Sequence, residues 1–277
     1  IKLEKRNALI EEQKKDIEDS IIYAGRIQQA MLPFIPDNPT KEEIPQYLVD
    51  NIKEGCIIHK PKDIVSGDFY YTNITPDGKV ILLVGDCTGH GVPGAFMSIL
   101  GNSLLNEVIN EKGISEPHWI LEELRSKIIS TLNQKGEFGE SRDGMDMALC
   151  VIDKNKGSLF FAGAYNPLYL IRKGELLEYK ADSQPVGYHT GELKPFTQIE
   201  IQMEEGDAFY IFSDGYADQF GGPKGKKFMT KRFKKLLVEV SDKHMNDQRE
   251  ILIDTIVKWM EEGNEEQIDD ICIMSFR

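Results

Sequence analysis

The sequence lacks the features that mark several large classes of protein. It has no CxxC pair, and its four cysteines, Cys56, Cys87, Cys150 and Cys272, lie far apart, so neither a disulfide framework nor a zinc site is indicated. No apolar run is close in length to a membrane-spanning helix, which needs about 20 residues. We recognise no signal peptide. We therefore expect a cytoplasmic protein with no membrane segment in this chain.

Positive charge is also scarce. The 33 Lys and Arg residues are outnumbered by 46 Asp and Glu residues, which gives a formal net charge of −13. A broad basic surface for nucleic acid is therefore not expected. The sequence contains no P-loop and no dinucleotide-binding glycine motif, so a nucleotide-binding function is not indicated. An acidic balance is compatible with carboxylate sites for divalent cations, and equally with an ordinary solvated surface.

The first 31 residues predict a charged helix with one apolar stripe. Leu3, Ile10, Ile17, Ala24 and Met31 recur every seven residues, which is the spacing of a coiled-coil seam. A helix that docks on its own domain would show a similar stripe. Two alternatives therefore stay open, a helix that pairs two chains into a homodimer and transmits a signal, or a self-docked helix.

The proline residues at 33 and 36 end this pattern. We therefore divide the chain into an N-terminal linker or dimerisation helix, residues 1–36, and a larger domain, residues 37–277. Because the chain begins at Ile1 and not at Met, we expect it to be a segment of a longer protein.

The larger domain predicts many short strands and few helices. Such an order favours layered sheets covered by helices over a regular βαβ repeat. The predicted strands are 52–59, 80–84, 147–152, 159–162, 168–172, 175–179, 196–202, 208–212 and 271–276. The predicted helices are 95–110, 116–133, 231–240 and 247–260.

Aspartates stand beside the ends of several apolar strands. Asp86 and Asp214 each end one, Asp269 precedes the last strand, and Asp68 adjoins an aromatic run. Isolated buried carboxylates are costly, so several of them should share a cation or hydrogen-bond donors. Oxygen ligands without a His or Cys cluster favour Mg²⁺ or Mn²⁺ over zinc. Taken singly, each aspartate is better explained as a turn or cap residue, and only the set predicts a metal site.

Seven segments, in their joint order and spacing, resemble the PPM family of metal-dependent serine/threonine phosphatases, which is similar to protein phosphatase 2C. The resemblance is strongest to the bacterial sporulation stage II protein E (SpoIIE) branch. The segments are YAGRIQQAMLP at 23–33, PKDIVSGDFY at 61–70, VGDCTGHGVPGAFMS at 84–98, FAGAYNPL at 161–168, QPVG at 184–187, YIFSDGYADQFGG at 210–222 and DDICIM at 269–274.

The resemblance implies a fold and a metal site. The fold is a four-layer α-β-β-α sandwich of two antiparallel sheets flanked by helices, preceded here by the coiled-coil-like N-terminal helix. The site holds two Mn²⁺ or Mg²⁺ ions. By motif, Asp86 bridges both ions and the backbone carbonyl of Cys87 completes one of them. Asp68 holds the same pair, directly or through water, while Asp214 and Asp269 bind the second ion.

Other residues near these motifs receive weaker predictions. His90 is placed to protonate the leaving seryl or threonyl oxygen, or it is an ordinary turn histidine. Asp270 is a less favoured ligand because it occupies the place of a neutral residue in the family. Asp146 could reach a third, weaker metal together with Asp143. For phosphate, Lys62 and the loop 224–227 are candidates, although a solvated turn describes that loop better.

The implied function is hydrolysis of phosphoserine or phosphothreonine on a regulatory protein through two-metal activation of water. The resemblance further implies a STAS-type anti-sigma-factor antagonist as the substrate, and a cytoplasmic output domain of a larger sensor as the context. Two alternatives stay open. One is a scaffold that keeps the fold without turnover, and the other is a metallohydrolase of small phosphate esters.

Overall fold

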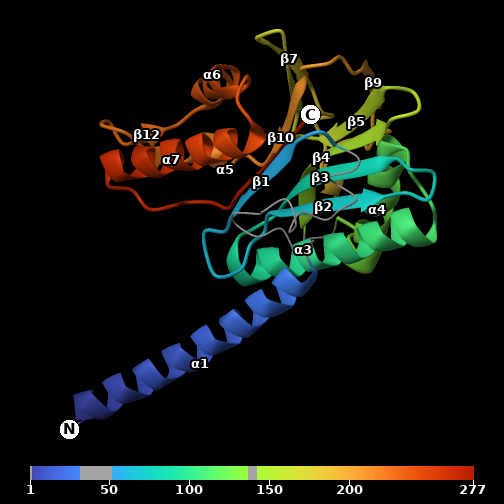
Figure 1. Ribbon diagram of the computed structural model, residues 1–277. Helices are drawn as coiled ribbons and strands as arrows, with labels where there is room; N and C mark the ends of the chain where they lie inside the picture. The colour runs from blue at the N-terminus through green and yellow to red at the C-terminus, as the bar shows by residue number, and fades with distance from the viewer. Residues whose placement is uncertain (1, 32–51, 137–141) are drawn as a thin grey trace.

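The computed structural model describes residues 2–31, 52–136 and 142–277, and it shows two antiparallel sheets lying face to face with helices on their outer sides (Figure 1). The predicted α-β-β-α sandwich and the N-terminal helix are therefore confirmed. The predicted boundary at residue 36 lies outside the described residues.

The first sheet has the strand order β1 (Gly55–Lys60), β13 (Ile271–Phe276), β10 (Ala208–Phe212), β6 (Leu168–Arg172), β7 (Glu175–Tyr179). The second sheet has the order β2 (Phe69–Ile74), β3 (Val80–Cys87), β4 (Gly144–Asp153), β5 (Ser158–Ala164), β9 (Ile199–Gln202), and β8 (Val186–Gly187) pairs with the start of β4. A small hairpin is formed by β11 (Phe220–Gly221) and β12 (Lys226–Lys227).

The helices form the outer layers. On the second sheet lie α3 (Gly91–Asn106), its π-helical continuation η1 (Glu107–Glu111) and α4 (Pro117–Thr131), and on the first sheet lie α6 (Thr230–Val240) and α7 (Met245–Gly263). The short α5 (Gly215–Asp218) follows β10, and α1 (Lys2–Met31) leads the chain.

Strand β3 contributes to two buried layers, one on each of its faces. Val80, Leu82 and Val84 pack between the two sheets, whereas Ile81 and Leu83 pack beneath α3 and α4. Successive side chains of a strand point to opposite faces, and here both faces are covered. This is why β3 is a continuous apolar run without alternation, and why an aspartate at its end is conspicuous.

Helix α1 projects away from the domain (Figure 1). Leu3, Ile10 and Ile17 on its apolar stripe are 70%, 49% and 61% exposed, so this part of the stripe does not dock on the domain. Near its C-terminal end, Gly25 and Gln28 are buried. The self-docked alternative therefore describes only the last turns of the helix, and the rest presents its seam to solvent.

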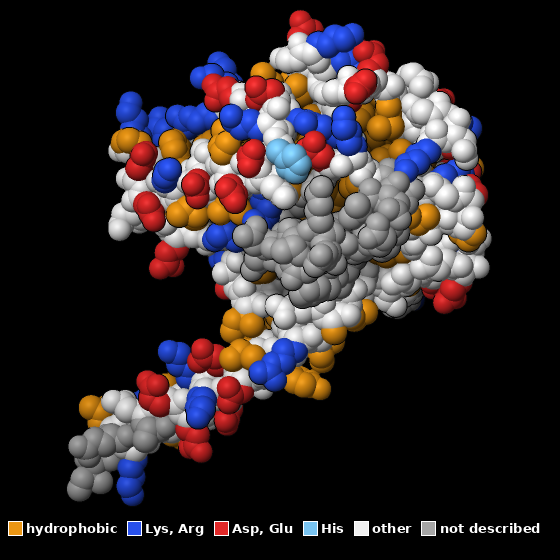
Figure 2. All heavy atoms as spheres, viewed as in Figure 1, with side chains coloured by type: hydrophobic (Ala, Val, Ile, Leu, Met, Phe, Trp, Pro, Cys, Tyr) orange, Lys and Arg blue, Asp and Glu red, His pale blue; other side chains and the backbone are white. Residues whose placement is uncertain are grey.

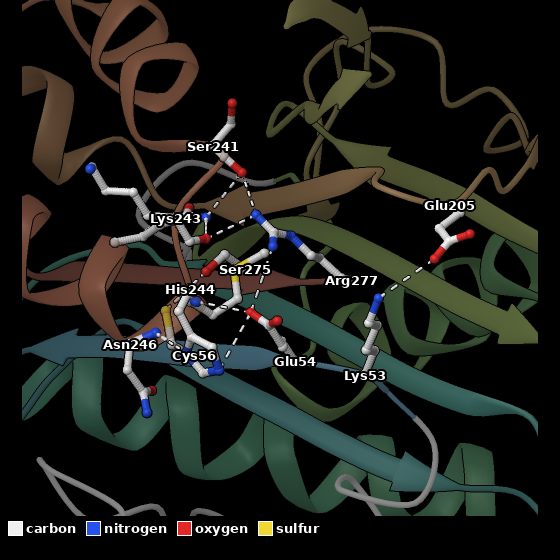
Figure 3. A network of polar contacts seen from close by, with 12 residues as sticks. Lys53, Glu54, Cys56, Glu205, Ser241, Lys243, His244, Asn246, Ser275 and Arg277 are labelled. Atoms are coloured by element: carbon white, nitrogen blue, oxygen red, sulfur yellow. Dashed lines mark hydrogen bonds and ion pairs between the residues drawn. The ribbon is translucent and has the colours of Figure 1, made fainter. Parts of the chain in front are cut away.

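A network at the C-terminus joins the first sheet to its helices (Figure 3). The guanidinium of Arg277 donates to the carbonyls of Ser241 and Lys243 in the turn between α6 and α7, and it lies 3.7 Å from Glu54. Glu54 in turn accepts the N–H of Met245, where α7 begins, at 3.1 Å. Among the described residues, no helix is long and apolar enough to span a membrane.

Candidate active site

A cavity of about 380 Å³ collects side chains from segments far apart in the chain. All six residues that the sequence analysis assigned to the site line it. They are Asp68, Asp86, Cys87, His90, Asp214 and Asp269. Asp146, Asp270 and Arg142 line it as well. Asp143 is not among its lining residues.

Strand register places two of the carboxylates opposite one another. Asp86 on β3 pairs in register with Asp146 on β4, so both side chains leave the same face of the sheet at the same end. Like charges directly opposite one another destabilise an antiparallel pair. The structure therefore makes Asp146 a direct neighbour of the central aspartate, which the sequence analysis considered only for a third, weaker metal.

Close backbone packing positions the loop that carries Asp68. A Cβ on Gly67 would lie 2.5 Å from the carbonyl oxygen of Gly89, and a Cβ on Gly94 would lie 2.3 Å from that same oxygen and 2.8 Å from the Gly67 Cα. Only glycine permits this approach. The segment before β2 therefore rests directly on the turn after β3 and on the first turn of α3.

Asp270 holds the same loop from the other side. Its Oδ1 accepts the N–H of Lys62 and its Oδ2 accepts the N–H of Gly67, both at 2.7 Å. Both of its oxygens thus serve the backbone of the loop, and the side chain is buried. Asp270 is a positioning residue in this arrangement, which agrees with its lower rank as a ligand.

Asp68 has its own fixed partner. The Ser213 hydroxyl donates to Asp68 Oδ2 at 2.5 Å, and the N–H of Cys272 donates to Ser213 Oγ at 3.0 Å. One carboxylate oxygen of Asp68 is thereby oriented by the strands of the first sheet. This contact could not be predicted from the sequence, because Ser213 is 145 residues away from Asp68 along the chain.

The electrostatics of the cavity are those of crowded, poorly hydrated carboxylates. Burial, then the neighbouring Asp214, Asp146 and Asp269, raise the pKa of Asp86 to about 8. Burial and then Asp214 raise the pKa of Asp146 to about 7. Burial also raises the pKa of Asp68, Asp214 and Asp269 above the ordinary range. Such a cluster is stabilised by bound cations.

The chemical type of the donor atoms in the cavity suits divalent metal ions. It consists of carboxylate oxygens and the adjacent backbone, without a His or Cys pair, which suits Mg²⁺ or Mn²⁺. In the described part of the chain, no three His, Cys, Asp or Glu side chains enclose a single ion position. Ions held here would therefore depend on backbone oxygens and water as well, as is usual for Mg²⁺.

His90 lies at the rim of the cavity with its ring held at both nitrogens. Nδ1 lies 3.1 Å from Asp63 Oδ2, and Nε2 lies 3.3 Å from the Nζ of Lys62. An ammonium group can only donate, so Nε2 accepts and Nδ1 carries the proton that Asp63 accepts. The side chain is 54% exposed, which leaves it within reach of a substrate.

Two features of the site were missed by the sequence analysis. Arg142 brings the only guanidinium among the described lining residues, and it sits just before β4 beside a segment without periodicity. Gln28 of α1 is buried, accepts the N–H of Ser66 at 3.0 Å and donates to the Ser66 carbonyl at 2.5 Å. Helix α1 is thus bonded to the backbone two residues before Asp68.

Comparisons with known proteins agree with this geometry. The sequence profile of Stage II sporulation protein E (SpoIIE) matches residues 76–277. The SiaA-PP2C domain of Pseudomonas aeruginosa is 33% identical with a TM-score of 0.80, over 96% of this chain and 98% of that one. The phosphatase domain and regulatory fragment of SpoIIE from Bacillus subtilis is 21% identical with a TM-score of 0.64, over 81% of this chain and 62% of that one.

A serine/threonine phosphatase of S. agalactiae is 15% identical with a TM-score of 0.59, over 80% of this chain and 98% of that one, and supports the fold alone. Comparison with curated proteins gave no match. The chain belongs to the SpoIIE family, and it is a PP2C-type serine/threonine phosphatase domain.

Proposed function

We propose that this domain dephosphorylates phosphoserine or phosphothreonine on a regulatory protein in bacterial signalling, with two Mn²⁺ or Mg²⁺ ions in the carboxylate cavity. The observation that carries the proposal is the convergence of Asp68, Asp86, Asp146, Asp214 and Asp269 on one cavity. When bound, two such ions activate water for attack on phosphorus and neutralise charge on the phosphoryl oxygens.

The protein residues divide the remaining work. Asp86, at the end of β3, and Asp68 would hold the ions together with the backbone carbonyl of Cys87. Asp214 and Asp269 would hold the second ion. Ser213 keeps one oxygen of Asp68 turned toward the first sheet, which fixes the direction of the other. These assignments extend the motif resemblance to side chains that share a cavity.

His90 would donate the proton that the seryl or threonyl oxygen needs on leaving. Asp63 orients the ring through Nδ1, and this leaves Nε2 as the nitrogen for proton transfer. Since Lys62 donates to Nε2 in the present arrangement, that nitrogen carries no proton. The step therefore requires the ammonium group to move off Nε2 and Nε2 to take up a proton from solvent water before it protonates the leaving oxygen. The same Lys62 would then be free to contact the phosphoryl oxygens of a bound substrate.

The partner and the context remain part of the proposal. A STAS-type anti-sigma-factor antagonist is the substrate class we favour. The RsbU and RsbW domains of Rv1364c from Mycobacterium tuberculosis are among the structural relatives. They are 20% identical with a TM-score of 0.60, over 80% of this chain and 59% of that one. The exposed stripe on α1 supports a homodimer formed through that helix.

The test is phosphate release from a phosphoserine peptide with Mn²⁺, with EDTA, and by Asp86→Asn. We expect release that requires the metal and disappears in the variant. Metal binding is followed separately by calorimetry, so that a folded protein which binds Mn²⁺ without turnover would indicate a scaffold. Hydrolysis of small phosphate esters with none of the peptide would overturn the protein-phosphatase assignment.

A further inference from the structure

A strongly basic segment interrupts this acidic chain. Between Asp218 and Glu239 there are seven Lys or Arg residues and no Asp or Glu, although the chain as a whole carries a net charge of −13. The segment folds as the β11–β12 hairpin and α6. Figure 2 shows blue side chains along the upper left of the molecule, in the region of β12 and α6, above red side chains in the region of α7.

Three of these seven cations are paired with carboxylates, and Arg232 lies over the ring of Trp259. Lys227 pairs with Asp218 at 2.7 Å, Lys234 with Glu178 at 2.9 Å and Lys235 with Glu239 at 3.3 Å. Lys224, Lys226 and Lys231 are exposed and make no ion pair within the part of the chain that the structure describes. We call these three residues the lysine patch.

An exposed apolar side chain lies within the lysine patch. Met229 is 56% exposed and has φ 74°, a backbone conformation that is strained for a residue with a side chain. Its N–H donates to the carbonyl of Ala217 at 2.7 Å, which holds the start of α6 against α5. Apolar contact combined with unpaired cations is the composition of a protein-docking surface.

Aromatic packing against Trp259 of α7 fixes the position of this segment. The Arg232 guanidinium lies 4.5 Å from the centre of the Trp259 ring and donates to the carbonyl of Phe228 at 3.3 Å. Phe228 meets Trp259 edge to face with ring centres 5.4 Å apart. The lysine patch is therefore presented on a fixed base, which lowers the entropy cost of binding a partner.

The hairpin that carries Lys224 and Lys226 is linked to the carboxylate cavity through Lys227. The N–H of Asp218 donates to the carbonyl of Asp214 at 3.0 Å, and Asp218 pairs with Lys227 on the hairpin. A partner bound on the hairpin and on the start of α6 would therefore lie beside Asp214, which lines the cavity.

Neighbouring carboxylates favour a protein partner over a flat anionic surface. Glu261, Glu262 and Glu265 at the end of α7 are exposed, and α7 packs against β11. An ideal Cβ on Gly225, at the hairpin tip, would lie 3.6 Å from Glu265 Oε1. A bilayer broad enough to reach all three lysines would meet these carboxylates as well, whereas a small acidic face can avoid them.

We propose that the lysine patch and Met229 dock an acidic face of the phosphorylated protein substrate, next to its phosphoserine, and thereby select substrates with Asp or Glu near the phosphorylated residue. The inference rests on the proposed phosphatase function and adds the chemistry by which that function recognises its partner. Unpaired cations at a rim chiefly raise the association rate, so the selection should weaken with salt.

The test compares two fluorescent phosphoserine peptides of equal length, one flanked by Asp and Glu and one by Asn and Gln. Binding is measured by fluorescence anisotropy and turnover as kcat/KM with Mn²⁺. The triple variant Lys224→Glu, Lys226→Glu, Lys231→Glu is compared with a control that reverses three exposed lysines, Lys154, Lys156 and Lys173, on turns at the opposite end of the sheets. The control carries the same net charge as the test variant.

We expect the parent and the control to prefer the acidic peptide by on the order of tenfold at low salt, and the patch variant to lose that preference. Hydrolysis of p-nitrophenyl phosphate should be equal in all three proteins. Equal binding of both peptides by the parent, or a preference that survives in the patch variant, would overturn the proposal. Lysine-dependent binding to phosphatidylserine vesicles without a peptide preference would also overturn it, in favour of a membrane surface.

The peptide-binding measurement distinguishes failure of this inference from failure of the proposed function. If neither peptide releases phosphate but the parent still binds the acidic peptide through the lysine patch, then the docking surface stands and the phosphatase assignment fails. If p-nitrophenyl phosphate and the neutral peptide are hydrolysed but acidic flanks bring no advantage, then the phosphatase assignment stands and the docking surface fails.

Discussion

The opposed carboxylates Asp86 and Asp146 make a prediction about stability that does not depend on turnover. They face one another across β3 and β4, and the pKa of Asp146 is raised to about 7 by burial and by Asp214. An ionised Asp146 therefore destabilises the metal-free fold. Asn has the same shape without the charge, so Asp146→Asn should be more stable than the parent protein in EDTA at pH 8.

The rise in pKa sets the magnitude. A rise from the ordinary value of 3.8 to about 7 corresponds to about 4 kcal/mol, at about 1.4 kcal/mol for each pKa unit. Asp146 is partly exposed, and solvent screening lowers this ceiling. We expect about 2 kcal/mol, or roughly 4 to 8 °C in Tm for a domain of this size.

The pH dependence has a definite sign. The pKa of Asp146 and Asp86 in the folded protein lies above that in the unfolded chain, so folding takes up protons, and stability falls as pH rises toward the folded values of about 7 and about 8. The advantage of Asp146→Asn should therefore shrink between pH 8 and pH 5. With saturating Mn²⁺ the order should reverse, because bound cations stabilise the parent cluster.

Thermal unfolding followed by circular dichroism in EDTA, at pH 5 and pH 8, measures these effects. Asp254→Asn is the matched control, because Asp254 is an exposed aspartate on α7, away from the cavity. A Tm of Asp146→Asn equal to or below that of the parent in EDTA at pH 8 would refute the reasoning. It would show that Asp146 is well hydrated in the metal-free protein or paired with a cation such as Arg142.

Substitutions at three further residues, and one deletion, test the surroundings of the site. Arg142→Ala should raise KM for a phosphoserine peptide more than it lowers kcat, with partial rescue by Arg142→Lys, and unchanged steady-state kinetics would exclude a role in phosphate binding. Asp270→Asn turns an amide donor toward the N–H of Lys62 or of Gly67, so we expect a loss of about 1–3 kcal/mol in urea unfolding and reduced activity. Full activity would contradict its positioning role. Gln28→Ala leaves the Ser66 N–H without its acceptor and should lower both Tm and activity. Deletion of residues 1–31 with no change in activity or in oligomeric state by light scattering would exclude any influence of α1.

Sequence periodicity predicted the bounds of a strand correctly where turn residues marked both of its ends. β6, β7, β10 and β13 have the predicted bounds, and the aspartates beside β10 and β13 line the carboxylate cavity. The loop 221–227 was predicted as a solvated turn, but part of it forms the β11–β12 hairpin. Strands of two residues within a Gly- and Lys-rich stretch carry no periodic signal, so this difference could not be predicted.

The rest of the site depends on register and packing, which single-sequence patterns do not carry. The opposition of Asp86 and Asp146 follows only from the pairing of β3 with β4, two strands separated by two helices. The contact from Ser213 to Asp68 joins the two sheets. The motif around Asp86 was visible because a charged residue ends an apolar run, whereas Arg142 is one of many surface-type residues in the sequence and only its place in the structure sets it apart.

The loop before Asp68 is where the separate parts of the molecule meet. Gln28 of α1 bonds its backbone at Ser66, Asp270 at the start of β13 bonds it at Gly67, and Gly94 of α3 packs against the same glycine. Because glycine leaves no side chain to fill a gap, this loop depends on all three contacts for its position. A movement of α1 that broke the Gln28 contact would leave the buried N–H of Ser66 unpaired, at a cost of about 1–3 kcal/mol, whereas the Ser66 carbonyl would keep the Ser98 hydroxyl as its donor. That cost is comparable to a typical allosteric coupling energy of about 1–3 kcal/mol, so we expect a displacement of α1 to shift the loop that carries Asp68 into the carboxylate cavity.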